Sequence, residues 1–272
     1  MSDPHPKFGV PMTATQYAAE WKRSADAFRT AGHYAWMDEQ LGDAPQIMEI
    51  GCGSGASTLA LAGSGRKVLS IESNRDSVEG ALSLLASAGV SAEEVGLSQL
   101  GGLNVWTGSD VKIVHVDVFS KDFRNSLPPS SFDAILCWMT GTHPEHIGQC
   151  LGIPYLEFDG GEMARYRQKI QMTSYELGTL ALKTSGLVQI VDRAAIRSWA
   201  QKDQMRTELS EMQSELAGPR FKITKADCFL RKLTEGLNQS SIQYVASVPA
   251  GFDGVLVLTS SKARIAPAPS DA

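Results

Sequence analysis

Short apolar runs and longer amphipathic stretches alternate along the chain, which is typical of a fold built from strands and helices in turn. The runs have strand length and are bounded by turn residues, and the stretches between them carry apolar residues at helical spacing. This alternation predicts an α/β fold in which helices cover both faces of a parallel sheet. We expect parallel strands at 47–50, 68–72, 112–116, 130–138 and 186–192, and helices at 75–88, 164–184 and 193–216.

The two ends of the chain predict additions to this sheet. Residues 1–42 hold an arm and two helical stretches, the first of which begins near Thr13 or Thr15. Near the other end, 241–247 and 254–259 alternate between apolar and polar positions. This pattern predicts a C-terminal antiparallel hairpin.

The remaining segments complete the expected architecture. The stretch 90–111 has no clear period beyond a helix start at 91–94, so we interpret it as an insertion, and 265–272 is expected to be a disordered tail. The whole chain, 1–272, is expected to form a single domain. Its predicted centre is a doubly wound, mostly parallel, seven-stranded sheet with a C-terminal hairpin and N-terminal helices.

Composition narrows the possible classes of protein. With 272 residues, 43% of them hydrophobic and 20% charged, the chain can bury a sizeable core. A net charge of −5 gives no positive field for nucleic acid and disfavours such a partner. No apolar run approaches membrane-spanning length, and the N-terminus lacks the features of a signal peptide. The four cysteines form no Cys-x-x-Cys pair, so we expect reduced thiols in a cytoplasmic protein.

The most specific chemical signal is the glycine-rich segment 47–57, in which Gly51, Gly53 and Gly55 occupy alternate positions. It predicts a tight strand–turn–helix connection, where glycine adopts positive φ and lets a ligand approach the backbone. The N-terminus of the following helix offers free N–H groups to an anionic ligand. The second strand ends in Glu72, where an acid accepts hydrogen bonds from ribose hydroxyls in nucleotide-binding βαβ units.

Two nucleotide cofactors fit these residues. Gly51, Gly53 and Ala56 satisfy the dinucleotide pattern G-x-G-x-x-G/A, which is a weak signal by itself. Glu49, two residues before the first glycine, would repel a pyrophosphate but can hold the ammonium group of an amino acid. The series Glu49-x-Gly51-x-Gly53-x-Gly55 resembles the first motif of class I S-adenosylmethionine-dependent methyltransferases.

The resemblance implies S-adenosyl-L-methionine as cofactor and gives roles to further residues. Glu72 matches the acid that binds the ribose, and Asp117, followed by Val118, matches the acid that binds the adenine amino group. In that family an N-terminal helix commonly lies across the cofactor pocket, which makes Tyr17 a candidate lid residue. Trp138 could wall the pocket, although a buried core tryptophan is an equal alternative.

Ligands of open α/β sheets bind beyond the carboxyl ends of the strands, so a methyl acceptor should lie after the fourth strand. That segment, 137–146, lacks the Asn-Pro-Pro-Tyr type of motif found in several nucleic-acid and protein amino-methyltransferases. It carries His143 and His146, our candidate catalytic residues, because imidazole changes protonation near neutral pH and can act as a general base. Ordinary loop hydrogen bonds are the alternative. We expect no metal, because two adjacent histidines and an unplaced acid give too few ligands.

These features predict methyl transfer from S-adenosylmethionine to an oxygen or nitrogen atom of a small-molecule acceptor. One alternative is an NAD-dependent oxidoreductase. Glu49 and the terminal hairpin argue against it, since dinucleotide dehydrogenases usually continue into a second βαβ half. The other alternative is an S-adenosylmethionine binder with a different reaction, such as aminopropyl transfer, and no residue argues against it.

Overall fold

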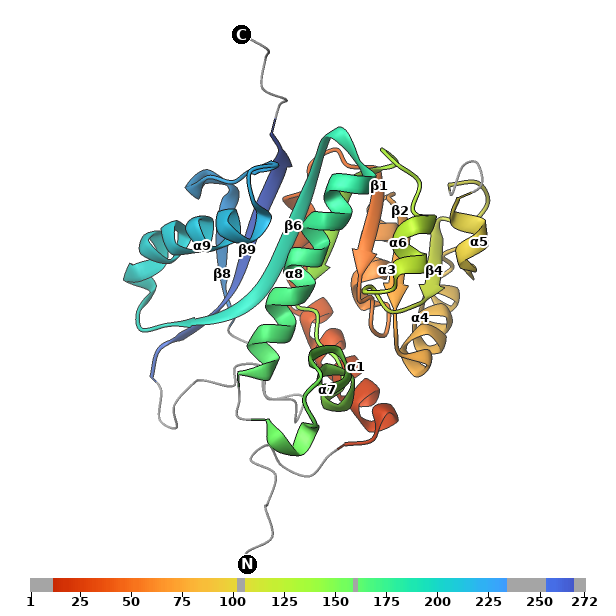
Figure 1. Cartoon of the computed structure of the whole chain (residues 1–272), viewed down its shortest axis with the longest axis horizontal. Coiled ribbons are helices and arrows are strands. Elements are labelled where there is room, and N and C mark those ends of the chain that lie inside the picture. The colour runs from red at the N-terminus through yellow and green to blue at the C-terminus, as the bar shows by residue number, and fades with distance from the viewer. Residues whose placement is uncertain (1–11, 102–105, 159–160, 234–252, 267–272) are drawn as a thin grey trace, which may run out of the picture.

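A nine-stranded sheet forms the centre of the computed structural model, which describes residues 12–101, 106–158, 161–233 and 253–266 (Figure 1). Within these ranges the strand order is β3-β4-β2-β1-β5-β6-β9-β7, and β8 also pairs with β9. The first six strands in this order pair in parallel, whereas β9 is antiparallel to β6, β7 and β8. The strands are β1 (Gln46–Ile50), β2 (Lys67–Glu72), β3 (Ala92–Glu94), β4 (Val111–His115), β5 (Phe132–Trp138), β6 (Leu182–Ile196), β7 (Phe221–Lys222), β8 (Cys228–Lys232) and β9 (Val255–Ile265).

Helices cover both faces of this sheet, as the fold-class prediction requires. Side chains alternate across a strand, so Ile47 and Met48 of β1 belong to two different buried clusters. The Ile47 cluster includes α1 (Ala14–Thr30), α2 (His33–Glu39), α3 (Ala56–Gly63) and α4 (Arg75–Ser87), and the Met48 cluster includes α5 (Leu97–Leu100), α6 (Lys121–Ser126), α7 (Pro144–Leu151) and α8 (Glu162–Ala181). The doubly wound α/β fold is therefore confirmed.

Helix α9 and three 3-10 turns complete the elements of the described chain. Helix α9 (Lys202–Ala217) follows β6 and packs near β8 and α8. Single 3-10 turns are η1 (Tyr155–Glu157), η2 (Trp199–Gln201) and η3 (Lys225–Asp227). Among the described helices, none combines the length and the apolar character that a membrane crossing needs.

The sheet is wider than the seven strands predicted, because short strands add to it at both ends. Residues 91–94, expected to start a helix, instead contain β3, whose Ala92 pairs with Val111 of β4. The side chain of Glu94 forms an ion pair with Arg75 at 2.7 Å. Residues 92–94 therefore extend the sheet edge, where pairing with β4 gives their backbone groups hydrogen-bond partners, and the short helix α5 follows them.

The C-terminal part of the sheet also differs from the prediction. Strand β6 was expected to end at residue 192 but continues to Ile196, because its pairing with β9 continues to Val255. The polar helix expected from Arg193 therefore begins at Lys202. An antiparallel ending is confirmed, with β9 between β6 and β8, whereas the expected strand at 241–247 lies outside the described residues.

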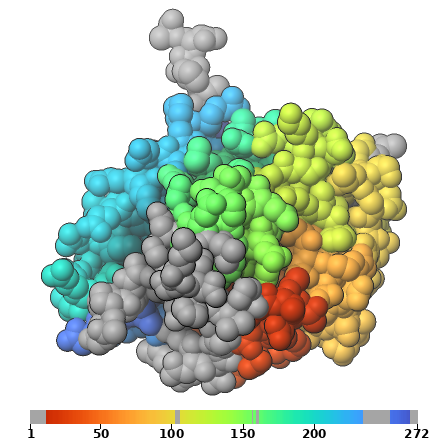
Figure 2. Space-filling view, turned by 60° about the horizontal axis from the view of Figure 1, so that its bottom comes forward, coloured from red at the N-terminus to blue at the C-terminus, as the bar shows by residue number. Residues whose placement is uncertain are grey.

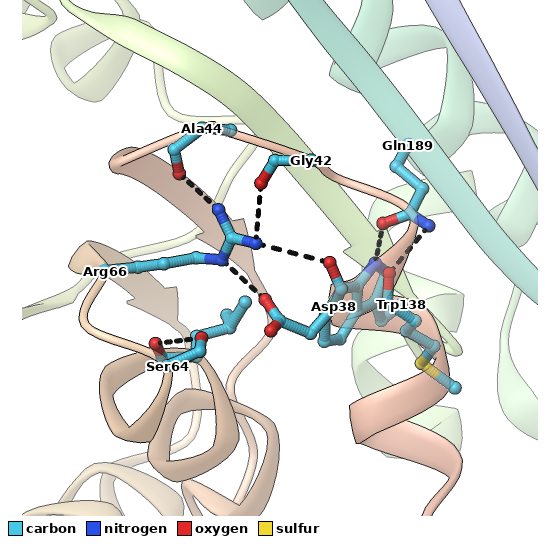
Figure 3. A network of polar contacts seen from close by, with 9 residues as sticks. Asp38, Gly42, Ala44, Ser64, Arg66, Trp138 and Gln189 are labelled. Atoms are coloured by element: carbon cyan, nitrogen blue, oxygen red, sulfur yellow. Dashed lines mark hydrogen bonds and ion pairs between the residues drawn. The ribbon is translucent and has the colours of Figure 1, made fainter.

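A buried arginine joins the N-terminal helices to the sheet (Figure 3). Arg66 lies in the turn before β2, and its Nε is 2.5 Å from the Asp38 carboxylate of α2. The guanidinium also donates to the backbone carbonyls of Ala44 at 2.7 Å and Gly42 at 3.0 Å. This bonding offsets the cost of burying an arginine whose side chain is only 9% exposed. Arg66 thereby fixes α2 and the segment that leads into β1.

Candidate functional site

A cleft lies beyond the carboxyl ends of β1, β2, β4 and β5, where ligands bind in open α/β sheets. Helix α1 borders it on one side, and α8 contributes Tyr166 and Ile170. Figure 2 shows the red residues of α1 beside the orange residues that include α4. Thr15 of α1 donates a hydrogen bond to Asp76 of α4 at 2.7 Å, which fixes one end of α1 at the cleft.

The glycine turn forms the floor of the cleft, as expected from the sequence. Gly51, Gly53 and Gly55 have φ values of 75°, 52° and 84°. Residues other than glycine adopt such positive φ values only with strain. A Cβ atom added to Gly53 would meet nothing within 4 Å, so this backbone is open to a ligand. Gly55 does not line the cleft. A Cβ atom there would be 2.9 Å from Ala81, so Gly55 permits close packing of α3 on α4.

Glu72 is held at this turn by backbone hydrogen bonds. Its Oε2 accepts from the Gly53 N–H at 2.9 Å and its Oε1 accepts from the Asn74 N–H at 2.8 Å. Burial raises the pKa of Glu72, and the backbone donors oppose this shift. Each carboxylate oxygen has a second lone pair, so a carboxylate that lines the cleft can still accept hydrogen bonds from a ligand.

Glu49 does not line the cleft, although the sequence predicted that it contacts the cofactor. Its side chain is 1% exposed and accepts hydrogen bonds from the hydroxyls of Ser57, Thr58 at 2.6 Å and Ser70 at 2.7 Å. Burial raises the pKa of Glu49, while these three donors lower it. The carboxylate thus joins β1, α3 and β2 below the glycine turn and supports the turn from behind.

The residues expected near adenine lie together at the end of β4. Asp117 and Val118 both line the cleft. The Oδ1 atom of Asp117 accepts a hydrogen bond from the Phe119 N–H at 2.8 Å, which orients the carboxylate in the loop.

The aromatic residues expected at the pocket also border the cleft. Tyr17 of α1 lies edge-on to Trp21, with ring centroids 6.1 Å apart. A Cβ atom at Gly141 would be 2.7 Å from the Trp21 ring, so glycine lets this helix approach the loop after β5. Trp138 is both a wall of the cleft and a buried core residue, the two roles considered for it from the sequence. It lines the cleft, is 5% exposed, and donates from Nε1 to Gln189 at 2.9 Å (Figure 3).

The two candidate histidines have different surroundings, because part of the segment expected to be a loop is helix α7. His143 caps the N-terminus of α7, where its Nδ1 accepts from the Glu145 N–H at 3.4 Å and its Nε2 contacts the Met12 carbonyl. Both of its ring nitrogens therefore have partners within the chain. His146 lies in the first turn of α7, and its Nε2 faces Asp117.

Some cleft residues had no distinct sequence signal. Thr140 lines the cleft, and its hydroxyl donates to the Ile50 carbonyl at 3.2 Å, joining the loop after β5 to β1. Ser54 also lines it, and among the described residues its buried hydroxyl has no hydrogen-bond partner. The available clues were the position of Thr140 just after β5 and the position of Ser54 between Gly53 and Gly55 of the glycine-rich segment. Cys52 and Cys137 are buried, which is typical of thiols that pack in a core, and burial raises the pKa of both, to about 11 for Cys137.

Comparisons with known proteins find similarity only at the level of solved structures. No protein-family model and no curated protein sequence matches the chain. The N-methyltransferase NodS from Bradyrhizobium japonicum WM9, in complex with S-adenosyl-L-homocysteine, is 12% identical, covering 94% of this chain and 100% of its own, with a TM-score of 0.48. The YcgJ protein from Bacillus subtilis is 13% identical, with 86% and 98% covered and a TM-score of 0.49. Phosphoethanolamine N-methyltransferase 2 from Haemonchus contortus is 14% identical, with 87% and 53% covered and a TM-score of 0.44.

Proposed function

We propose that this protein transfers a methyl group from S-adenosyl-L-methionine to an oxygen or nitrogen atom of a small-molecule acceptor. The observation that carries the proposal is the Glu72 carboxylate, fixed by the Gly53 and Asn74 N–H groups in a cleft at the carboxyl ends of parallel strands. A carboxylate in this position suits two ribose hydroxyls. The motif around Gly51 and Gly53 supports the same cofactor through its resemblance to class I methyltransferases.

The cleft residues fit the parts of this cofactor. Glu72 would accept from the ribose, and Asp117 and Val118 would contact the adenine. The open backbone at Gly53 admits close approach of the amino-acid part. The buried Ser54 hydroxyl, which lacks a partner among the described residues, would gain one from a polar ligand.

The chain's own contribution to the reaction is to position the acceptor. S-adenosylmethionine supplies a methyl group on a sulfonium, which is already a good leaving group. The protein must therefore hold the acceptor atom in line with the methyl and keep water away, and such positioning can supply much of a rate enhancement. Tyr17 of α1 and the loop residues Thr140 and Thr142 border the cleft after β5 and are the proposed acceptor contacts.

The position of Glu49 and the order of the last strands bear on the two alternative functions, an NAD-dependent oxidoreductase and an aminopropyltransferase. Because the Glu49 carboxylate is buried below the turn, it no longer argues against a dinucleotide. The antiparallel β6–β9–β8 ending still does, since a dinucleotide fold usually continues into a second βαβ half. Aminopropyl transfer would use the same cleft and remains an alternative.

We also propose a cytoplasmic location, which was expected from the cysteine pattern. All four cysteines are free thiols.

Calorimetry with S-adenosylhomocysteine and with NAD tests the cofactor. We expect S-adenosylhomocysteine to bind with a dissociation constant of about 1–100 μM and NAD to give no measurable heat at the same concentrations. Tight NAD binding without a response to S-adenosylhomocysteine would contradict the proposal. Labelled S-adenosylmethionine offered with a panel of small hydroxyl and amine compounds would then identify the acceptor.

The general base expected at His143 or His146 stays a prediction, and the contacts of His143 restrict it. We expect His143→Ala to lower the free energy of unfolding by about 1 kcal/mol through loss of the helix cap, while turnover falls less than about fivefold. His143→Asn is the matched control, because asparagine is a good helix cap but cannot act as a base. Turnover lowered a hundredfold or more in both variants would identify His143 as the base.

A further inference from the structure

Three side chains that could bind a metal meet beside the cleft, and the proposed methyl transfer leaves one of them without a role. Asp117 follows β4, whereas His146 and Cys150 lie one turn apart on α7. We call these residues the Asp–His–Cys cluster. Residues four apart on a helix share a face, so the spacing of His146 and Cys150 is that of a two-ligand helix site.

The distances in the cluster fit a shared ion better than a direct imidazole–carboxylate hydrogen bond. His146 Nε2 is 3.4 Å from Cys150 Sγ and 3.5 Å from Asp117 Oδ2, and the ligand atoms all lie within 4.8 Å of one another. Tetrahedral zinc with ordinary bond lengths separates its sulfur, nitrogen and oxygen ligands by about 3.4–3.6 Å. An N–H···O hydrogen bond is about 2.7–3.2 Å long, so the carboxylate is too distant for a good one. Both separations match those of ligands that share a cation, and an ion would replace the hydrogen bond that joins Cys150 Sγ and His146 Nε2 at 3.4 Å in the ion-free chain.

The packing of α7 holds its two ligands in place. A Cβ atom at Gly148 would be 2.5 Å from the Ile153 carbonyl, so the end of α7 lies directly against the chain that follows it. Lys169 of α8 donates to the Cys150 carbonyl at 2.8 Å, and the Tyr166 ring lies edge-on to His146 at 6.2 Å. Such support from neighbouring residues orients metal ligands.

The donor set suits zinc in particular. Sulfur, imidazole nitrogen and carboxylate oxygen are the ligands that Zn²⁺ prefers, whereas magnesium and calcium prefer oxygen alone. A cysteine binds a metal ion as its thiolate, so binding of a divalent ion at Cys150 would release the thiol proton.

We propose that Asp117, His146 and Cys150 form a binding site for a zinc-type divalent cation, with its fourth coordination position open to water or a solute in the cleft. Asp117 and His146 both line the cleft, so the open position is accessible from it. The ion would join α7 to the loop after β4. The second Asp117 oxygen, which accepts from the Phe119 N–H, still has a lone pair for an adenine amino group. This site goes beyond the proposed function, because ion binding requires no cofactor.

Titration of the chelator-treated full-length protein with Zn²⁺ and with Co²⁺ tests the site. We expect one ion per chain at about 10 μM or tighter, with cobalt absorption typical of tetrahedral coordination and a thiolate-to-cobalt charge-transfer band. Cys150→Ser should remove that band, and Cys150→Ser and His146→Gln should each weaken zinc binding at least about tenfold. Binding should strengthen as pH rises, because the thiol must lose its proton.

Two matched controls have the same residue types outside the cluster. His115→Gln changes an exposed histidine on β4, and Cys228→Ser changes a thiol on β8; both should keep the affinity and the cobalt spectrum. Circular dichroism of every variant separates loss of ligation from loss of fold. Absence of stoichiometric binding, or equal binding by the cluster variants and the controls, would overturn the proposal. Slower turnover of His146→Gln without any bound ion would also overturn it, in favour of a histidine base. Calorimetry with S-adenosylhomocysteine on the same samples separates a failure of this site from a failure of the proposed function.

Discussion

Glu72→Ala is expected to weaken the binding of S-adenosylhomocysteine by about 1.5–3 kcal/mol, or about 10- to 150-fold in dissociation constant. The reason is the loss of charge-assisted hydrogen bonds between one carboxylate and two ribose hydroxyls. The carboxylate also orders the turn, since it accepts from the N–H groups of Gly53 and Asn74. We therefore expect a smaller loss of stability in addition, about 1–2 kcal/mol in the free energy of unfolding.

Calorimetry on folded variants measures the affinity, and denaturation in urea measures the stability. Glu79→Ala is the matched control, because Glu79 lies on α4, is largely exposed and pairs only with Arg75 among the contacts described. Its affinity for S-adenosylhomocysteine should equal that of the unmodified chain. An unchanged dissociation constant in folded Glu72→Ala would show that Glu72 supports the turn without binding a ribose.

Glu49→Ala is expected to lower the free energy of unfolding by about 3–5 kcal/mol, the largest effect on stability that we predict. The substitution removes the common acceptor of three buried hydroxyls, on Ser57, Thr58 and Ser70. It also leaves a cavity where the Glu49 side chain, 1% exposed, had joined β1 to its neighbours. Urea denaturation followed by circular dichroism gives the change directly.

Glu49→Gln separates the hydrogen bonds from the charge. Glutamine keeps the shape and one acceptor oxygen of the side chain but carries no charge, and it replaces the other acceptor oxygen by an NH₂ group. We expect it to lose less than half as much stability as Glu49→Ala. Since Glu49 does not line the cleft, Glu49→Gln should also keep its affinity for S-adenosylhomocysteine within about threefold. If Glu49→Gln loses as much affinity as Glu72→Ala, Glu49 contacts the cofactor directly, as expected from the sequence.

The sequence by itself determined the features that depend on neighbouring residues. Alternating side-chain directions put Ile47 and Met48 on opposite faces of β1, which is why apolar runs could be recognised as strands buried on both sides. The glycine turn was equally local, because positive φ at Gly51 and Gly53 restricts the residue type at each position. Glu72 followed from the same logic, as a polar residue that ends an apolar strand.

The tertiary structure decided which partners each polar side chain has. Glu49 was expected to face a ligand, but hydroxyls of α3 and β2 surround it, and this depended on how those elements pack. The role of His143 changed because the segment after it forms α7, whose first turn needs a cap. Asp117 and Cys150 are 33 residues apart, and only the packing of α7 beside the end of β4 brings their ligand atoms within reach of one ion. Local patterns encode direction and turn geometry, whereas contacts between distant residues depend on which packing of the whole chain has the lowest free energy.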